Sequence, residues 1–231
     1  MRGRAEIFAN IRRGLGVGGR EAPRQLAVAQ RLATAPRGLV PARGQLAPEA
    51  RVALFLDMAI GAQATVEDVA SPHDVPAAIA DLLRRHNLAP RLRRGADPRL
   101  DAMPWGETAL EVAIGPSAGH DEVAVSHAAA GVAETGTLVM LSGPENPSTL
   151  NFLPDLHIVA VRRADIAPDY ETVWEALRAR YGIGQLPRTV NWITGPSRSA
   201  DIEQRLLLGA HGPRRLHVLV IGDDTSAPRP G

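Results

Sequence analysis

The chain has 231 residues, 45% of them hydrophobic, with 26 basic residues against 25 acidic ones. This suits one sizeable domain and argues against a broad nucleic-acid-binding surface. The absence of cysteine excludes thiolate nucleophiles, zinc–thiolate sites and cysteine-held iron–sulfur clusters, and the absence of lysine excludes a Schiff-base or P-loop lysine.

Residues 1–45 are expected to form a helical arm and a linker. Residues 5–15 carry apolar side chains at near-helical spacing and end at glycines, and residues 23–33 are a second expected helix. The Pro- and Gly-rich stretch 36–48 is long for a loop inside a compact domain, which is typical of a linker, a lid or a partner-binding segment. No apolar run like that of a signal peptide follows the N-terminus. We therefore expect a soluble, cytoplasmic protein without a membrane span.

Residues 46–222 are expected to form one α/β domain, followed by a flexible tail at 223–231. The expected strands are 52–58, 66–69, 110–114, 122–125, 137–141, 157–161, 189–193 and 216–221, and the expected helices are 76–86, 169–181 and 199–208. Strands that are apolar throughout and alternate with helices predict a three-layer α/β/α fold with a largely parallel sheet. Residues 189–221 are the clearest unit, with two parallel strands joined by a right-handed crossover through a helix.

The first candidate site follows the expected strand 189–193. Ligands of open α/β sheets bind at the carboxyl ends of strands, and free N–H groups at a helix start beside Arg198 suit a phosphate or carboxylate. Alternatively, Ser199 and Asp201 only cap the helix and Arg198 is a solvated charge. The candidate ligand-binding residues here are Gly195, Ser197, Arg198, Ser199 and Asp201.

The second candidate site is the turn Glu134-Thr135-Gly136-Thr137. It places a carboxylate, two hydroxyls and exposed amides in one short loop. Glu134 is the candidate catalytic residue, because a carboxylate here has the chemistry of a nucleophile or general base. Thr135, Gly136 and Thr137 are candidate ligand-binding residues. The alternative is a plain turn in which Gly136 takes a positive φ.

The histidines show no close metal-ligand spacing. His120, His127 and His157 would have to converge from separate loops to hold a metal, so we expect neither a metal nor a cofactor in this chain. His211 is expected at the amino end of the sheet, away from Ser197, in a structural role. Residues 146–151 form either part of a pocket wall or a surface turn, and the surface turn is favoured.

Four short segments follow one another in an order and spacing that can be compared with known families. They are residues 133–139 (Ala-Glu-Thr-Gly-Thr-Leu-Val), 153–158 (Leu-Pro-Asp-Leu-His-Ile), 194–203 and 209–213. Together they resemble the LUD-domain family, over roughly residues 50–221. The resemblance implies a fold similar to the superfamily of CoA-transferases, ribose-phosphate isomerases and glucosamine-phosphate deaminases. It also marks Glu134, Thr135 and Gly136, together with Gly195, Ser197, Arg198 and Asp201, as the positions expected to matter.

The resemblance further implies a role in oxidising L-lactate to pyruvate, alongside partner proteins that carry iron–sulfur clusters. The expected function is therefore a non-redox subunit that binds a small carboxylate or phosphate-bearing ligand. One alternative is a stand-alone CoA-transferase-like or sugar-phosphate-isomerase-like enzyme that uses Glu134, and another is a purely structural or regulatory module. Whether the chain alone is catalytic, and whether it forms a homo-oligomer, are left open.

Overall fold

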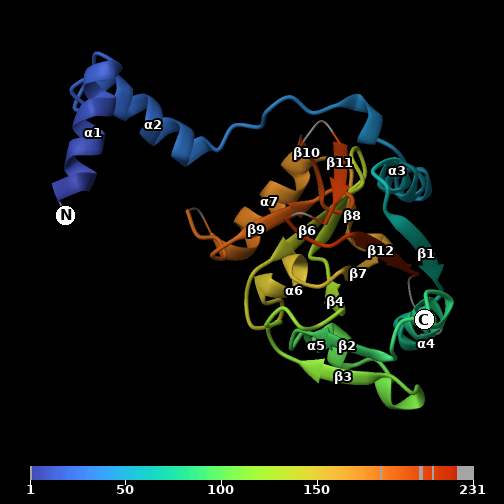
Figure 1. Ribbon diagram of the computed structural model, residues 1–231. Helices are drawn as coiled ribbons and strands as arrows, with labels where there is room; N and C mark the ends of the chain where they lie inside the picture. Colours follow the sequence, from blue (N-terminus) through green and yellow to red (C-terminus); the bar gives the residue numbers. More distant parts are fainter. Residues whose placement is uncertain (1, 183, 203–204, 210, 223–231) are drawn as a thin grey trace.

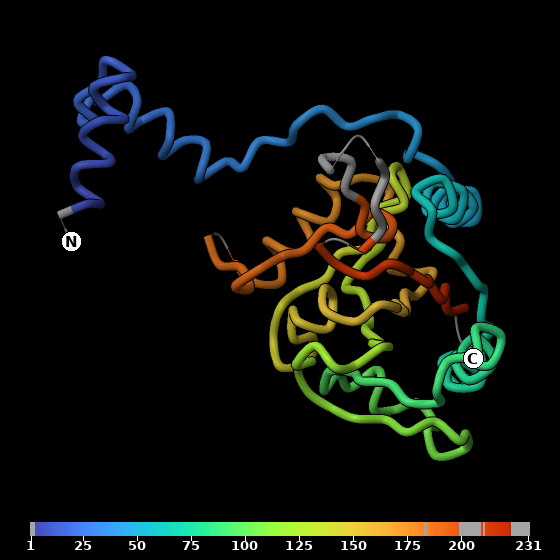
Figure 2. The backbone as a smooth tube through the Cα atoms, in the orientation of Figure 1, coloured from blue at the N-terminus to red at the C-terminus, as the bar shows by residue number. Residues whose placement is uncertain are grey.

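A six-stranded parallel sheet forms the centre of the computed structural model, which describes residues 2–182, 184–202, 205–209 and 211–222 (Figure 1, Figure 2). The expected tail at 223–231 lies outside the described residues. The strands, in spatial order, are β1 (Thr65–Val69), β12 (Arg215–Ile221), β7 (Leu156–Arg162), β4 (Val123–His127), β2 (Arg91–Arg94) and β3 (Glu111–Ile114). All neighbouring strands pair in parallel, so the expected α/β class is confirmed.

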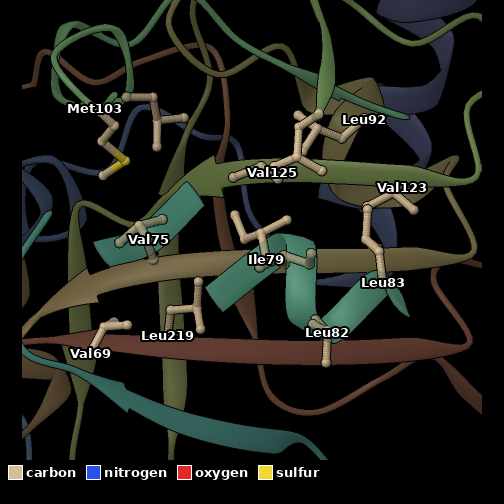
Figure 3. Close-up of a cluster of buried hydrophobic side chains, with 14 of the residues drawn as sticks. Val69, Val75, Ile79, Leu82, Leu83, Leu92, Met103, Val123, Val125 and Leu219 are labelled. Carbon is tan, nitrogen blue, oxygen red and sulfur yellow. The ribbon is translucent and has the colours of Figure 1, made fainter. Parts of the chain in front are cut away.

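One face of the sheet is covered by α4 (Val75–Arg85) and the short α5 (Pro98–Asp101). Ile79, Leu82 and Leu83 lie on one side of α4, as the spacing predicts, and pack against β4 and β12 (Figure 3). The central strands β4, β7 and β12 are buried almost throughout, because the sheet is covered on both faces. The 3-10 turns η2 (Pro72–Asp74) and η3 (Trp105–Glu107) connect these elements.

The other face is covered by α3 (Pro48–Gly61) and by a second, smaller sheet. Its strands, in spatial order, are β8 (Ile166–Ala167), β5 (Ala130–Val132), β6 (Thr137–Leu141) and β9 (Val190–Ile193). Leu138 and Met140 of β6 face the large sheet, while Val139 faces α7 (Tyr170–Tyr181) on the outside. The small sheet is thus a layer between the large sheet and α7. The remaining short helices are α6 (Ser148–Phe152) and η4 (Arg163–Asp165).

The expected strand at 52–58 is wrong, because these residues belong to α3. Val52, Phe55 and Ala59 are buried at helical spacing, and Pro48 occupies the first turn, where its missing N–H costs nothing. A short apolar run cannot distinguish a strand from a well-covered helix by periodicity alone.

The expected helix at 199–208 is also wrong. This segment forms the antiparallel pair β10 (Arg198–Ile202) and β11 (Arg205–Leu208). The strand before it, β9, belongs to the small sheet, whereas β12 after it belongs to the large one, so the expected parallel crossover does not exist. Helix propensity amounts to only about 0.7 kcal/mol or less for an ordinary residue, and backbone pairing outweighs it here.

The N-terminal arm consists of α1 (Arg2–Gly14) and α2 (Ala22–Thr34), which extend away from the rest of the molecule (Figure 2). Their exposed large apolar residues are Ile7, Phe8, Ile11, Leu26, Val28 and Leu32.

The linker that follows these two helices contacts α7: Arg37 pairs with Glu175 at 2.9 Å, and the Gly38 N–H donates to Glu171 at 3.0 Å. It then enters η1 (Ala42–Gly44). No helix in the described part of the chain is both long and apolar enough to cross a membrane.

Gly136 supplies a stability test. Its φ is +65°, and a Cβ there would overlap the backbone nitrogen of Ala59 in α3. We expect Gly136→Ala to lower the free energy of unfolding by about 2–5 kcal/mol, through backbone strain and overpacking together.

Gly182→Ala is the matched control. Gly182 has a φ of +89° and a ψ of 167° but nothing within 4 Å of a built Cβ, so only backbone strain of about 1–3 kcal/mol applies. Urea unfolding of both variants measures the difference. An equal loss of unfolding free energy in the two variants would show that the contact of residue 136 with α3 adds nothing to the effect of Gly136→Ala.

Candidate functional site

A cavity of about 260 Å3 lies at the amino ends of β7 and β12. Its walls come from α6, from the segment 192–198 at the end of β9, and from residues 211–213 before β12. The polar residues that line it are Asn151, His157, Thr194, Ser197, Arg198 and His211. Five of these, His157, Thr194, Ser197, Arg198 and His211, belong to segments that the sequence singled out.

Two buried side chains present polar atoms without partners to this cavity. Asn151 is 1% exposed, and neither its Oδ1 nor its Nδ2 has a hydrogen-bond partner among the described residues. His157 is 0% exposed; its Nε2 lies 3.0 Å from Ser126 Oγ, while its Nδ1 has no partner there. An unpaired buried polar group costs about 1–3 kcal/mol. Three such atoms belong to residues that line this cavity, which makes it the candidate site for a polar ligand.

Burial lowers the pKa of His157 to about 3. The ring is therefore neutral at pH 7 and carries one proton, which belongs to one of its two nitrogens. Arg198 is exposed and is the cation of the site. The cavity thus combines neutral hydrogen-bonding groups inside with one positive charge at its entrance.

Ser197 connects the two loops that border the cavity. Its N–H donates to the Pro213 carbonyl at 2.9 Å, and its Oγ accepts from the His211 N–H at 3.3 Å. The expectation that His211 lies away from Ser197 is therefore wrong. The hairpin of β10 and β11 returns the chain to the place where it left, whereas a crossover helix would have carried it to the other end of the sheet.

The loop at Ser197 does not precede a helix, so it has no N-terminal dipole to offer an anion. Gly195 has a φ of +71° and packs against the Ala62 carbonyl at the end of α3, which is a structural role. The side chains of Ser199 and Asp201 lie outside the described part of the chain. Of the residues predicted in this segment, Gly195, Ser197 and Arg198 line the cavity.

The Glu-Thr-Gly-Thr turn touches this site through hydroxyl groups. Thr137 Oγ1 lies 2.6 Å from Thr194 Oγ1 and 2.7 Å from Thr135 Oγ1, and the Tyr170 hydroxyl lies 2.9 Å from both Thr135 and Thr137. Thr194 lines the cavity, so this hydroxyl network helps to fix one of the residues of the cavity wall. The positive φ of Gly136, expected for a plain turn, is confirmed.

Glu134 is 3% exposed and lies beside the start of α7. Its Oε1 accepts from the Tyr170 N–H at 3.4 Å, and its Oε2 has no partner among the residues described. It does not line the 260 Å3 cavity. Its catalytic role stays a prediction.

The candidate metal-ligating histidines do not converge. His127 is the last residue of β4, whereas His157 lies near the start of the neighbouring β7, so the two occupy opposite ends of the sheet. Within the described ranges, no group of three or more His, Asp or Glu residues has the arrangement of a metal site.

The sequence points to Asn151 and His157 but does not predict their place in this cavity. Residues 146–151 are expected as a surface turn in preference to a pocket wall, and His157 is considered only as a metal ligand and as the first residue of an expected strand. The usable signal was a histidine within the apolar run of β7, Leu-His-Ile-Val-Ala-Val. Only the fold shows that α6 places Asn151 beside it.

Comparison with known proteins identifies the family. The LUD domain matches residues 52–221. The chain belongs to the LUD-domain family. It is 35% identical over 103 residues to lactate utilization protein C of Halalkalibacterium halodurans, covering 44% of this chain and 45% of that protein. It is 34% identical over 93 residues to lactate utilization protein C of Bacillus subtilis, covering 40% of this chain and 39% of that protein. The matches thus span less than half the length of these relatives.

The fold has a counterpart among solved structures. A DUF162 family protein from Deinococcus radiodurans superposes with a TM-score of 0.58 at 24% identity, covering 77% of this chain and 99% of that one. This likeness confirms the fold.

Three buried histidines predict a pH dependence of stability. Burial lowers the pKa of His157 to about 3 and those of His127 and His217 to about 4. In the unfolded chain these values return to about 6.5. Between about pH 6.5 and pH 4 the unfolded chain therefore binds more protons. The free energy of unfolding should fall on acidification through this window, by up to about 1.4 kcal/mol per pH unit for each histidine.

Urea unfolding at about pH 7 and about pH 5 measures this loss. We expect His217→Gln to reduce it, because one of the three histidines is removed. His120→Asn should leave it unchanged, because His120 is exposed and is not one of the groups that shift the pKa of these three histidines. Equal wild-type stability at both pH values would contradict the assignment of neutral, buried rings.

Proposed function

We propose that this chain is a non-redox subunit of an L-lactate-utilisation system and that it binds a small hydroxy carboxylate in the cavity of Asn151 and His157. The unpaired amide of Asn151, 1% exposed at the cavity wall, is the observation that carries the ligand proposal. The names of the relatives in Halalkalibacterium halodurans and Bacillus subtilis support the lactate part. A cytoplasmic location belongs to the same proposal.

Lactate suits the groups around the cavity. Its carboxylate needs a cation and hydrogen-bond donors, which Arg198 and the Asn151 Nδ2 supply. Its hydroxyl both donates and accepts, so it can pair with Asn151 Oδ1 or with His157 Nδ1. A neutral His157 matters here, because it can offer a lone pair that a protonated ring lacks.

The electron-transfer part of the reaction belongs to other proteins in this proposal. Oxidising lactate to pyruvate releases an electron pair and two protons, and the chain has no cysteine to hold an iron–sulfur cluster. We infer iron–sulfur partner proteins that accept those electrons. Co-purification from cells grown on lactate tests this: a cluster-bearing protein should be recovered with the chain, and its absence would contradict the subunit role.

Calorimetric titration with L-lactate tests the ligand. We expect Asn151→Leu and Arg198→Gln each to weaken binding by about tenfold or more, the equivalent of about 1.4 kcal/mol. Leucine has the branching and the number of heavy atoms of asparagine and leaves no polar atom unpaired, so Asn151→Leu should remain folded, which its melting temperature checks.

Arg43→Gln is the control for charge, because Arg43 is exposed in the linker and does not line the cavity. It should bind lactate as the wild type does. Lactate binding that survives Asn151→Leu and Arg198→Gln unchanged would move the ligand away from this cavity.

A further inference from the structure

A second cavity, of about 490 Å3, opens at the carboxyl edge of the large sheet. Asp97 and Arg99 follow β2 at this edge, and His127 ends β4. After β2 the chain passes through α5 to β3, which is the neighbour of β2 on the side away from β4. After β4 the chain passes through the small sheet to β7, which is the neighbour of β4 on the side away from β2. The gap between β2 and β4 is therefore where the chain direction across the sheet reverses. Open α/β sheets bind ligands at such points.

His127 presents a lone pair to this cavity. It is 4% exposed, and its Nδ1 lies 2.9 Å from the Ala128 carbonyl. A carbonyl oxygen only accepts, so Nδ1 carries the proton and Nε2 is the acceptor. Burial, followed by the charge of Arg99, lowers the pKa of His127 to about 4, which keeps the ring neutral at pH 7. No described residue hydrogen-bonds to Nε2.

Asn146 supplies a second acceptor. It is 5% exposed, and its Nδ2 donates to the Leu141 carbonyl at 3.3 Å. That bond leaves Oδ1, which is buried and has no partner among the described residues. Glu145 also lines the cavity. Because the wall is rich in acceptors, a ligand that fills it has to bring several hydrogen-bond donors.

The two arginines of the cavity differ in what they can bind. Arg99 is held by Asp97 at 2.7 and 3.0 Å and by the carbonyls of Ala128 and His127 at 3.1 and 3.4 Å, so its charge is already paired. Arg180, exposed on α7, lies over the Tyr181 ring at 5.2 Å, and no described carboxylate pairs with it. Among the described residues that line the cavity, Arg180 is therefore the cation without a carboxylate partner.

We propose that this cavity binds a polyhydroxylated organic anion. Its hydroxyl groups donate to His127 Nε2 and Asn146 Oδ1, and its anionic group lies against Arg180. Sugar acids and sugar-alcohol phosphates share this chemistry. The site is separate from the lactate cavity: it lies at the opposite edge of the sheet and shares no lining residue with it.

Calorimetric titrations of the full chain with gluconate, sorbitol 6-phosphate and uncharged sorbitol test the proposal. We expect at least one of the two anions to bind, and sorbitol to bind about tenfold more weakly or not at all. Binding of gluconate alone selects a carboxylate ligand, and binding of sorbitol 6-phosphate alone selects a phosphate. If neither binds at millimolar concentration, the proposal is overturned.

Matched arginine variants on α7 locate the binding. Arg180→Gln should weaken anion binding by about tenfold, whereas Arg178→Gln, on the same helix but not lining the cavity, should not change it. His127→Phe removes the acceptor and should also weaken binding, provided that its melting temperature shows a folded protein. Anion binding that is lost in Asn151→Leu, or is unaffected by Arg180→Gln, would overturn the proposal. Neither result depends on whether lactate binds.

Discussion

The end of α3 leaves no room for a side chain at two positions in the loops that face it. Gly136 meets the backbone of Ala59, and Gly195 meets the Ala62 carbonyl, both at positive φ. These contacts hold the turn before β6 and the loop after β9 against the same helix. The hydroxyls of Thr137 and Thr194 then come within 2.6 Å of each other, and Thr194 forms part of the cavity that Asn151 and His157 line. The packing of α3, the geometry of the turn at Gly136 and the shape of the cavity therefore all depend on the close approach of these two loops to the backbone of α3.

Some buried polar side chains have hydrogen-bond partners for all their polar atoms, whereas others do not. Arg99 is bonded to the Asp97 carboxylate and to the Ala128 carbonyl, so its polar atoms are well paired. Asn151 and Asn146 each keep at least one buried atom without a described partner, and both line cavities. Native proteins pair the great majority of buried polar atoms. The unpaired atoms of Asn151 and Asn146 therefore coincide with cavities, whereas that of Glu134 does not line either cavity.

Local sequence pattern was enough to predict much of the fold. The helix at α4 and the strand at β7 follow from spacing and from apolar content, because each one buries a face that its own sequence defines. The apolar run of α3 did not distinguish helix from strand. The hairpin of β10 and β11 was missed because pairing between strands is not visible in local propensity. The site was found in part: Ser197 and Arg198 were identified, but Asn151 lies beside them only through tertiary packing.

Neighbouring residues of β4 serve opposite faces of the sheet. Ser126 is hydrogen-bonded to His157 on one face of the sheet. His127 points to the other face and lines the cavity of about 490 Å3. Because side chains alternate along a strand, inserting or deleting one residue in β4 would exchange these two positions and disturb both cavities at once. A change of length in the turn before β4, by contrast, leaves the alternation of these two side chains intact. Changes in length among relatives of this chain should therefore fall in that turn and be absent from the strand.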